Sequence, residues 1–227
     1  MKTLIIGNGE VGTSLYRILK PYYPVTIKNK EKLKIKGIEI LHICFPYSKD
    51  FIKKVREYQK EYKPKYTIIH STVKVGTSRK LDAVHSPIIG IHPFLEKSLK
   101  TFIKFLGGEK AGEVADYFRR TGMRVYIVDK SETTELAKLS QTTQYALMIE
   151  YVKDLKRECD KYDVPFSEVY TLFSQNYNDG YQKLGYPEYK LPLLIPIMKP
   201  QRGHCTIPNC NFWDTEFTKL IKKLNKV

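Results

Sequence analysis

The 227-residue chain has no long hydrophobic run and little cysteine. No apolar stretch approaches the roughly 18 residues that a membrane-spanning helix needs, so we expect no membrane segment. The first residues lead directly into a strand-like run at positions 2–6, without the layout of a signal peptide. Four cysteines, at positions 44, 159, 205 and 210, are too few and too scattered for a disulfide framework. These absences predict a cytoplasmic protein whose length suffices for two modest domains.

Acidic residues are also scarce. The chain has 24 carboxylates against 39 lysines and arginines, and its formal net charge is +15. The lysines are spread through the predicted helices, for example at positions 49, 53 and 60, which is typical of a solvated surface. The other interpretation is a positive field that attracts nucleotides, phosphosugars or nucleic acid. We expect no nucleic-acid partner, because the sequence has no helix-turn-helix, zinc-finger or RNA-binding signature.

Strand-like and helix-like segments alternate over the first 130 residues. This alternation predicts an α/β fold, a compact Rossmann-like parallel sheet covered by helices on both faces. Only a short basic stretch separates the second strand from the third, so one helix-plus-strand unit of the usual doubly wound order is expected to be deleted. The strand-like runs are 3–6, 25–27, 38–45, 66–70, 84–91 and 124–128, and the helical patterns are 10–20, 48–62 and 109–121.

The pattern becomes purely helical after residue 130. Residues 132–162 form one long helical pattern without proline or glycine, followed by helices at 164–177 and 213–225 and a proline-rich connection at 187–200. We therefore predict a dinucleotide-binding domain at 1–130 and a smaller all-helical substrate and dimerisation domain at 131–227. The apolar residues expected to form core and dimer seam on the long helix are Leu136, Leu139, Tyr145, Met148 and Val152.

A glycine-rich loop joins the first strand to the first helix. The pattern G-x-G-x-x-G, placed after a strand and at the start of a helix, is the context that a dinucleotide-binding loop requires. The first glycine permits a tight turn, the second lets backbone approach a pyrophosphate, and the third lets helix and strand pack closely. The alternative is a glycine turn that has lost its ligand. The predicted cofactor-binding residues of the loop are Gly7, Asn8, Gly9, Glu10, Val11 and Gly12.

The end of the second strand bears on the choice of cofactor. An Asp or Glu there normally accepts hydrogen bonds from the adenosine ribose, whereas this sequence has Lys28, Asn29 and Lys30. A carboxylate would repel a 2′-phosphate and lysines would attract it. We therefore expect NAD or NADP as cofactor and hypothesise that the site tolerates NADP and could prefer it, with Asn29 and Lys30 among the residues that bind the cofactor.

Five further segments share their motifs, and the order of these motifs, with one enzyme family. They are residues 42–46 (HICFP), 70–77 (HSTVKVGT), 86–87 with 107–108 (SP and GG), 135–139 (ELAKL) and 203–208 (GHCTIP). Together they resemble the UDP-glucose/GDP-mannose dehydrogenase family, and the last is similar to its UDP-N-acetylmannosamine dehydrogenase branch. The resemblance covers the NAD-binding and central domains, and we expect this chain to lack the family's third, nucleotide-sugar-binding domain.

The resemblance implies an NAD(P)-dependent oxidoreductase that acts on an alcohol of a small or sugar-derived substrate. It implies that the Cys205 thiolate attacks an aldehyde intermediate and that Lys138 stabilises negative charge on the substrate oxygen. Arg202 and His204 beside the cysteine would favour its thiolate form. A homodimer built on the long helix is also implied. The remaining implied residues are Pro46, Ser71 and Thr72 for the cofactor and Thr142, His204 and Asn209 for the substrate.

The sequence departs from the family at three places. Thr142 stands where the family has an asparagine, one helical turn after the lysine. Asn209 replaces the acid that would assist a water molecule, and the glutamates expected near residues 86–87 are absent. These departures favour a non-catalytic nucleotide-binding module. A second alternative is a two-electron dehydrogenase of the β-hydroxyacid type, which would use Lys138 without a cysteine nucleophile, because a lysine on a helix that leads from a sheet domain into a helical domain also resembles the arrangement of that family.

Single residues also have simpler interpretations. Cys205 could be an ordinary loop cysteine and Lys138 a surface lysine. A metal site of Cys205, Cys210 and His204 has loose spacing and no second pair nearby, so we expect no metal. His85 and His92 could face the nicotinamide as general bases, although a hydrogen-bonded structural role is the more common one.

Overall fold

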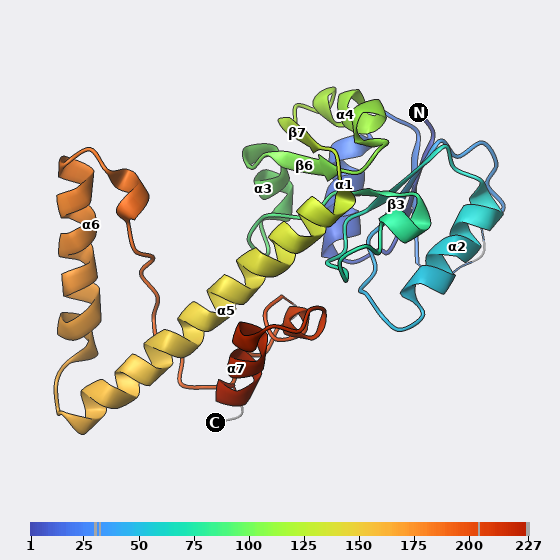
Figure 1. Cartoon of the computed structure of the whole chain (residues 1–227). Helices are drawn as coiled ribbons and strands as arrows, with labels where there is room; N and C mark the ends of the chain where they lie inside the picture. Colours follow the sequence, from blue (N-terminus) through green and yellow to red (C-terminus); the bar gives the residue numbers. More distant parts are fainter. Residues whose placement is uncertain (30, 32, 204, 226–227) are drawn as a thin grey trace. The chain divides into compact units, whose positions relative to one another are not determined.

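The computed structural model describes residues 1–227 except 30, 32, 204 and 226–227 (Figure 1). The chain divides into two compact units, Met1–Ser140 and Gln141–Val227. Helix α5, Ser131–Lys161, begins in the first unit and continues into the second. The predicted boundary at 130/131 coincides with the start of this helix, ten residues before the division between the units. Each unit is described separately below.

The first unit contains one seven-stranded sheet in the order β2-β1-β3-β4-β5-β6-β7. Strands β1 to β5 are parallel along this order, β6 is antiparallel to β5, and β7 is parallel to β6. The strand bounds are β1 Thr3–Ile6, β2 Val25–Lys28, β3 Ile40–Ile43, β4 Tyr66–Ile69, β5 Val84–His85, β6 Lys104–Gly107 and β7 Val125–Val128.

The strand order confirms the predicted deletion. In the usual order another strand lies outside β2, but here β2 is the edge strand and β1 pairs on its other side with β3. The sheet is mostly parallel, as predicted, but β6 and β7 run opposite to the other five strands. Helix α3, Leu95–Thr101, and strand β6 were not predicted from the sequence. Helix α3 does not carry the chain back to the other end of the strands. The chain therefore enters β6 at the same end of the sheet at which it left β5, and the two strands run in opposite directions.

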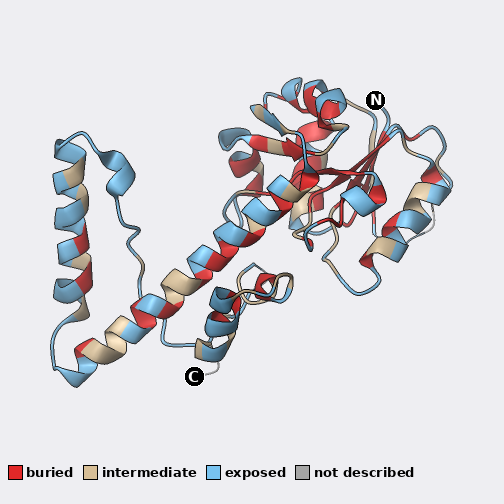
Figure 2. Ribbon diagram, viewed as in Figure 1, coloured by how far each residue is buried: buried red, intermediate tan, exposed pale blue. Residues whose placement is uncertain are grey.

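Helices cover both faces of this sheet, as predicted. Alternate residues of β1 point to opposite faces: Ile5 packs with α1, α3 and α4, whereas Leu4 and Ile6 pack with α2 and the 3₁₀ turn η1. Figure 2 shows the central strands as almost wholly buried. The helix bounds are α1 Glu10–Leu19, α2 Phe51–Tyr62, η1 Arg79–Leu81, α3 Leu95–Thr101 and α4 Ala111–Arg119.

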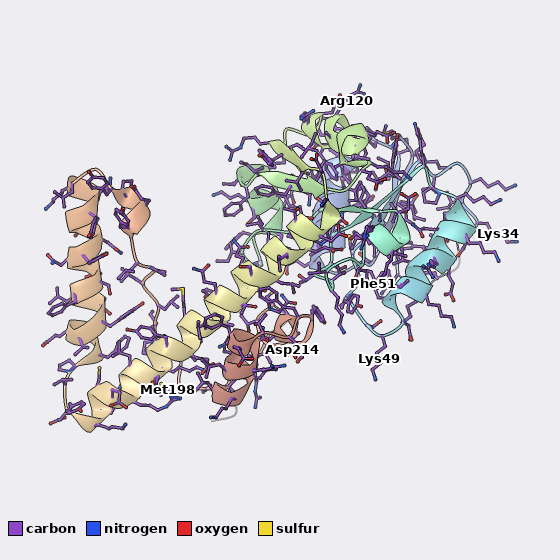
Figure 3. All side chains as sticks on the ribbon, viewed as in Figure 1. Lys34, Lys49, Phe51, Arg120, Met198 and Asp214 are labelled. Carbon is purple, nitrogen blue, oxygen red and sulfur yellow. The ribbon has the colours of Figure 1, made fainter. Side chains whose placement is uncertain are left out.

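The lysines named from the sequence lie on the surface. Lys49, Lys53 and Lys60 are all exposed, and the side chains of Lys49 and Lys34 extend outward from the first unit in Figure 3. Phe51, on the same helix as Lys53 and Lys60, is fully buried. Helix α2 is therefore amphipathic, which supports the interpretation of the lysines as a solvated surface.

The described part of the second unit contains helices and connections. Its elements after α5 are the π-helical turn η2 Ser167–Leu172, α6 Phe173–Lys183, the 3₁₀ turns η3 Pro187–Tyr189 and η4 Asn209–Asn211, and α7 Glu216–Leu224. Helix α6 extends beyond the predicted end at residue 177. The core of the unit is small: Ala146, Cys210 and Ile221, with Leu147 and Ile207 against them. None of the described helices is long and apolar enough to cross a membrane.

The long helix α5 does not bury its predicted apolar seam as one stripe. Leu139 and Val152 are buried, whereas Leu136 is 43% and Tyr145 51% exposed. A buried ion pair lies along the same helix, with Lys153 Nζ 2.9 Å from the Glu150 carboxylate. Gln201 donates to that carboxylate and to the Ala146 carbonyl, so the connection before α7 is held by polar contacts.

Candidate functional site

The carboxyl ends of β2, β1, β3, β4 and β5 lie along one edge of the sheet, because these strands are parallel neighbours. We call this end of the sheet, where the parallel strands terminate, the carboxyl edge; it is not one of the two edge strands. The Ser71 hydroxyl, after β4, donates to the Phe45 carbonyl after β3 at 2.6 Å and ties two of these ends together. The predicted cofactor residues that follow the strands at this edge are residues 7–12 after β1, Asn29 after β2, Pro46 after β3, and Ser71 and Thr72 after β4.

Two of the three glycines of the loop have a steric reason within the protein. Gly7 has φ +110°, and a Cβ on it would lie 2.9 Å from the Cys44 carbonyl carbon. A Cβ on Gly12 would lie 1.9 Å from the Gly7 carbonyl oxygen, so α1 approaches the loop too closely for any side chain there. A Cβ on Gly9 would meet no atom within 4 Å. The first and third glycines are therefore required by packing, whereas protein packing does not explain the second.

Gly9 is the N-cap of α1 and provides no side chain to cap the helix. The first N–H groups of an α-helix lack partners within the helix, and together with the helix dipole they form a site for an anion. The one acid in the first turn, Glu10, accepts a hydrogen bond from the His92 ring. His92 therefore lies beside the start of α1, where it offsets part of the Glu10 charge when protonated.

The end of β2 differs from the prediction. Lys28 is buried, and its ammonium donates to the Tyr62 hydroxyl at 3.1 Å between the rings of Tyr58 and Tyr62. Because it is buried against these two rings, the Lys28 ammonium is not available to a phosphate at the surface, which removes one of the lysines expected to attract NADP. Lys30 lies outside the described residues.

A carboxylate that the sequence analysis missed is found at the same strand end. The Asn29 backbone N–H donates to Glu31 at 2.7 Å. Hydrogen bonds from the backbone N–H groups of Glu31 and Asn29 lower the pKa of the Glu31 carboxyl. The sequence signal was an acid placed three residues after β2, instead of at its end.

A continuous chain of polar side chains crosses the buried part of the sheet, and we call it the core chain. The Thr3 hydroxyl lies 3.1 Å from the Tyr117 hydroxyl, which lies 3.0 Å from His42 Nε2. His42 Nδ1 lies 2.8 Å from His70 Nε2, and His70 Nδ1 lies 2.8 Å from the Ser86 carbonyl oxygen. Burial lowers the pKa of His42 to about 3 and that of His70 well below its usual value. Both rings are therefore neutral.

Lys104, the first residue of β6, lies at the end of the core chain. Its amine is 3.0 Å from the Ser86 carbonyl, 3.4 Å from the Pro87 carbonyl and 3.3 Å from His70 Nδ1. Burial lowers the pKa of Lys104 to about 7, and it raises the pKa of the neighbouring Cys44 thiol to about 12. Neither Lys104 nor the core chain was identified from the sequence, because strands far apart in the sequence bring these residues together.

Lys138 lies near the start of α5, and its ammonium donates to the Ile88 carbonyl at 2.8 Å. One turn earlier, the buried Glu135 carboxylate accepts the N–H groups of Gly76 and Ser78 at 2.5 and 2.8 Å. Burial raises the pKa of Glu135, whereas these two donors lower it. The bonds fix the first turns of α5 to the loop after β4, and Lys138 is thereby held at residues 86–88, directly after β5.

His85 has the structural role. Its ring is fully buried, with Nδ1 2.8 Å from the Thr134 hydroxyl and Nε2 3.3 Å from the Ser71 carbonyl. Burial lowers its pKa to about 3. His85 therefore joins β5, α5 and the loop after β4 as a neutral ring.

The predicted residues of the second unit fall into two groups. Asn209 donates to the Thr142 hydroxyl at 3.3 Å, and both side chains are buried. Cys205 is exposed, whereas Cys210 is buried and burial raises its pKa. His204 lies outside the described residues, so its predicted effect on Cys205 is not described. Among the residues that are described, no cluster of three His, Cys, Asp or Glu side chains could hold a metal.

A separate cavity of about 600 Å³ opens at the other edge of the sheet. It lies at the end of the sheet where β5 begins and where β6 and β7 end, because β6 and β7 run opposite to β5. Four of its charged side chains form two pairs: Arg79 lies 2.6 Å from Glu132, and Lys110 bonds to Asp82. It is lined by Arg79, Asp82, Ala83, Gly108, Glu109, Lys110, Asp129, Lys130, Ser131 and Glu132.

No family model and no curated protein match the sequence. Solved structures match over the whole chain. UDP-D-ManNAc dehydrogenase of Pyrococcus horikoshii has a TM-score of 0.79 at 16% identity, over 100% of this chain and 68% of its own. Mycobacterium tuberculosis 3-hydroxyisobutyrate dehydrogenase has 0.71 at 11%, over 100% and 93%. Psf3 in complex with NADP+ has 0.56 at 12%, over 99% and 93%. The chain therefore shares the fold of these proteins, and the UDP-sugar dehydrogenases that the sequence resembles are among them.

The buried neutral histidines predict a stability that falls in acid. A histidine whose pKa is lowered on folding stabilises the folded chain at pH values above its pKa in the unfolded chain, which is near 6.5. This stability is lost as the pH falls below 6.5. Below pH 6.5, wild type should therefore lose about 1.4 kcal/mol per pH unit more than the variant His85→Gln. Urea unfolding of both proteins between about pH 6.5 and 4.5 measures this difference. A difference that does not change with pH would show that His85 is not held neutral.

Proposed function

We propose that the chain is an NAD(P)-dependent oxidoreductase that acts on an alcohol of a small or sugar-derived substrate. The observation that carries the proposal is Gly9: its Cα faces open space at the uncapped start of α1, while Gly7 and Gly12 are fixed by contacts within the protein. A pyrophosphate bound there would receive N–H donors from the first turn of the helix. The shared fold with the two named dehydrogenases and with Psf3 supports this function.

The described residues favour NAD over NADP. Lys28 is held between two tyrosine rings, and the Glu31 carboxylate lies on the backbone N–H of Asn29. A carboxylate at the end of the second strand binds ribose hydroxyls and repels a 2′-phosphate. Calorimetric titration with both cofactors measures the preference. Clearly tighter binding of NADP would contradict it.

Replacing Gly9 by alanine should weaken cofactor binding without changing the fold. The new Cβ meets no protein atom within 4 Å, but it occupies the space through which a pyrophosphate approaches the helix. We expect the Kd for NADH to rise about tenfold or more, which corresponds to about 1.4 kcal/mol. Gly112→Ala on α4 is the matched control, because its Cβ also meets nothing within 4 Å. Equal affinities of the two variants would contradict the site.

Lys138 is the proposed electrostatic catalyst. A bound nicotinamide would accept hydride from the alcohol carbon, and the Lys138 ammonium would stabilise negative charge on the substrate oxygen. Its hydrogen bond to Ile88 holds the ammonium at the segment after β5, where the carboxyl edge ends. The two hydrogen bonds to the buried Glu135 carboxylate, one turn earlier, fix the orientation of the helix about its axis and therefore the direction of the Lys138 side chain.

Cys205 is the proposed nucleophile for a second oxidation. Its exposed thiol is accessible, whereas Cys159 and Cys210 are buried. As a thiolate it would add to the aldehyde to give a thiohemiacetal, which would transfer a second hydride to a second molecule of oxidised cofactor. The resulting thioester would be hydrolysed by water to a carboxylate, which releases the thiol. Thr142 and Asn209, which bond to each other, are proposed to contact the substrate with His204.

All four cysteines are free thiols, which supports the predicted cytoplasmic location.

The second candidate is a two-electron β-hydroxyacid dehydrogenase. It is supported by the match to 3-hydroxyisobutyrate dehydrogenase, 93% of whose length this chain covers. It is supported also by Asn209, which provides no carboxylate to assist water. This chemistry needs Lys138 and leaves Cys205 without a role.

The yield of NADH distinguishes the candidates. UDP-N-acetylmannosamine should give two NADH per substrate molecule if Cys205 is catalytic. The variant Cys205→Ser should then stop the reaction at the aldehyde, after one NADH has formed. 3-Hydroxyisobutyrate should give one NADH and be insensitive to that variant. Lys138→Met should abolish turnover on either substrate and leave the Kd for NADH unchanged. Turnover by Lys138→Met at the wild-type rate would disprove its role, and no turnover of either substrate would favour a nucleotide-binding module.

We also infer a homodimer formed through the second unit. Large apolar side chains are exposed there, such as Tyr162 at 75%, Phe173 at 73% and Ile195 at 84%, and exposed apolar patches typically mark interaction sites. Sedimentation velocity at micromolar protein should give the mass of two chains. A monomer at that concentration would contradict this inference.

A further inference from the structure

Two lysines hold three consecutive carbonyl groups after β5. The Lys104 amine lies 3.0 Å from the Ser86 carbonyl and 3.4 Å from the Pro87 carbonyl, and the Lys138 ammonium lies 2.8 Å from the Ile88 carbonyl. The segment 86–88 has no regular secondary structure. The hydrogen bond between His70 and Ser86 also holds it, as do the Ser86 backbone N–H, which donates to the Ile69 carbonyl at 2.8 Å, and the packing of Ile88 in the core.

The hydrogen bonds around Lys104 match a neutral amine. A carbonyl can only accept, so His70 Nδ1, 2.8 Å from the Ser86 oxygen, carries its proton and donates it. An ammonium would then have three N–H groups and only two carbonyl acceptors in these contacts. A neutral amine has two N–H groups for the two carbonyls and one lone pair, which faces the ring N–H of His70 at 3.3 Å.

The same constraint fixes the direction of the whole core chain. With its proton on Nδ1, His70 accepts at Nε2 from His42 Nδ1, and His42 accepts at Nε2 from the Tyr117 hydroxyl. Tyr117 then accepts from the Thr3 hydroxyl. Every proton in the chain therefore points toward the Ser86 carbonyl, and both histidines are Nδ1–H tautomers.

The chain can also run in the opposite direction, with the loss of one hydrogen bond: His70 Nδ1 no longer donates to the Ser86 carbonyl, so the two acceptors must move apart and that carbonyl accepts from Lys104 alone. If Lys104 takes up a proton, its third N–H requires an acceptor, and His70 Nδ1 becomes one when the ring proton moves to Nε2. His42 then donates from Nε2 to Tyr117, Tyr117 donates to Thr3, and Thr3 donates to the Met1 carbonyl at 3.2 Å. Each side chain keeps one proton in both states, and the added proton stays on Lys104.

The surroundings of Lys104 favour the uncharged form. Its side chain is 3% exposed, and the part of the chain that the structure describes contains no carboxylate paired with it. The groups that face it are His42 and Cys44 from β3 and its end, His70 after β4, His85 on β5 and Lys138 on α5. The Phe118 ring of α4 covers it at 5.8 Å. Lys138 opposes a second positive charge there, and Cys44 remains a thiol because burial raises its pKa to about 12.

We propose that Lys104 is a positioning residue that acts as a neutral amine: it fixes the segment that holds Lys138, and its protonation reverses the hydrogen bonds of the core chain. Its importance for catalysis rests on the proposed function. The switch itself does not, because it involves neither cofactor nor substrate. In the neutral state the positive charge of the pair is on Lys138, the lysine proposed to contact the substrate oxygen.

Histidine tautomers provide the direct test. The full chain with ¹⁵N-labelled histidine is titrated from about pH 9 to 5.5, and ring ¹⁵N–¹H correlations are recorded. His42 and His70 should be Nδ1–H at high pH and change together to Nε2–H near pH 7 without becoming cationic, since the pKa of Lys104 is about 7. In Lys104→Met both rings should stay Nδ1–H throughout. The proposal is overturned if the wild-type tautomers do not change, and this result needs no variant to fold.

A second readout tests the positioning of Lys138. Competitive acetylation with acetic anhydride, quantified by mass spectrometry, gives the reactivity of each lysine. In Lys104→Met the segment 86–88 loses two donors, so we expect the acetylation rate of Lys138 to change at least threefold, with exposed Lys54 as the internal reference. An unchanged Lys138 rate beside an unchanged Lys54 rate would overturn the positioning role. Cofactor binding and turnover are not measured in either experiment, so the proposed function fails or holds separately.

Discussion

The contact between Gly12 and the Gly7 carbonyl is the constraint on which the rest of the candidate site depends. A Cβ at Gly12 would lie 1.9 Å from that oxygen, so α1 can approach the end of β1 only because no side chain is there. This approach directs the start of α1 at the carboxyl edge of the sheet and leaves Gly9 facing open space. The ends of β3 and β4 meet the same edge, since β1 is flanked by parallel neighbours. One steric requirement therefore places both the helix end proposed to bind an anion and the residues around it.

The sheet behind this edge is unusual in its polar interior. Its core contains two neutral histidines, a tyrosine hydroxyl and a buried amine, joined into one hydrogen-bonded chain. A buried polar group is costly unless it is satisfied, and this chain satisfies each member. It ends on the carbonyls of the segment that holds Lys138. The interior of the sheet and the proposed catalytic lysine are therefore connected through three consecutive backbone carbonyls.

Features encoded by neighbouring residues were predictable from the sequence. The glycine loop, the long helix and the missing strand outside β2 follow from local spacing, because each depends on residues within one or two adjacent segments. The antiparallel β6 was not predictable, since its direction is set by how α3 returns the chain to the sheet. The short runs that form α3 and β6 also carry weak periodicity.

The candidate site was predictable only in part, for the same reason. Positions after strand ends could be named, and the structure places residues 7–12, Ser71 and Thr72 at the carboxyl edge. The burial of Lys28 against Tyr62 joins β2 to α2, and the contact of Lys104 with His70 joins β6 to the end of β4. No local pattern indicates such pairs. They are visible only when distant strands lie side by side.

Amide chemical-shift mapping shows whether a dinucleotide binds at the carboxyl edge. The uniformly ¹⁵N-labelled full chain is titrated with NADH to millimolar concentration. We expect the largest shifts at the amides of Gly9, Glu10 and Val11, with further shifts at Ser71. Shifts confined to the separate cavity at the opposite end of the sheet, at Asp82, Gly108 and Ser131, would contradict binding at the carboxyl edge. A spectrum that does not change would contradict it as well.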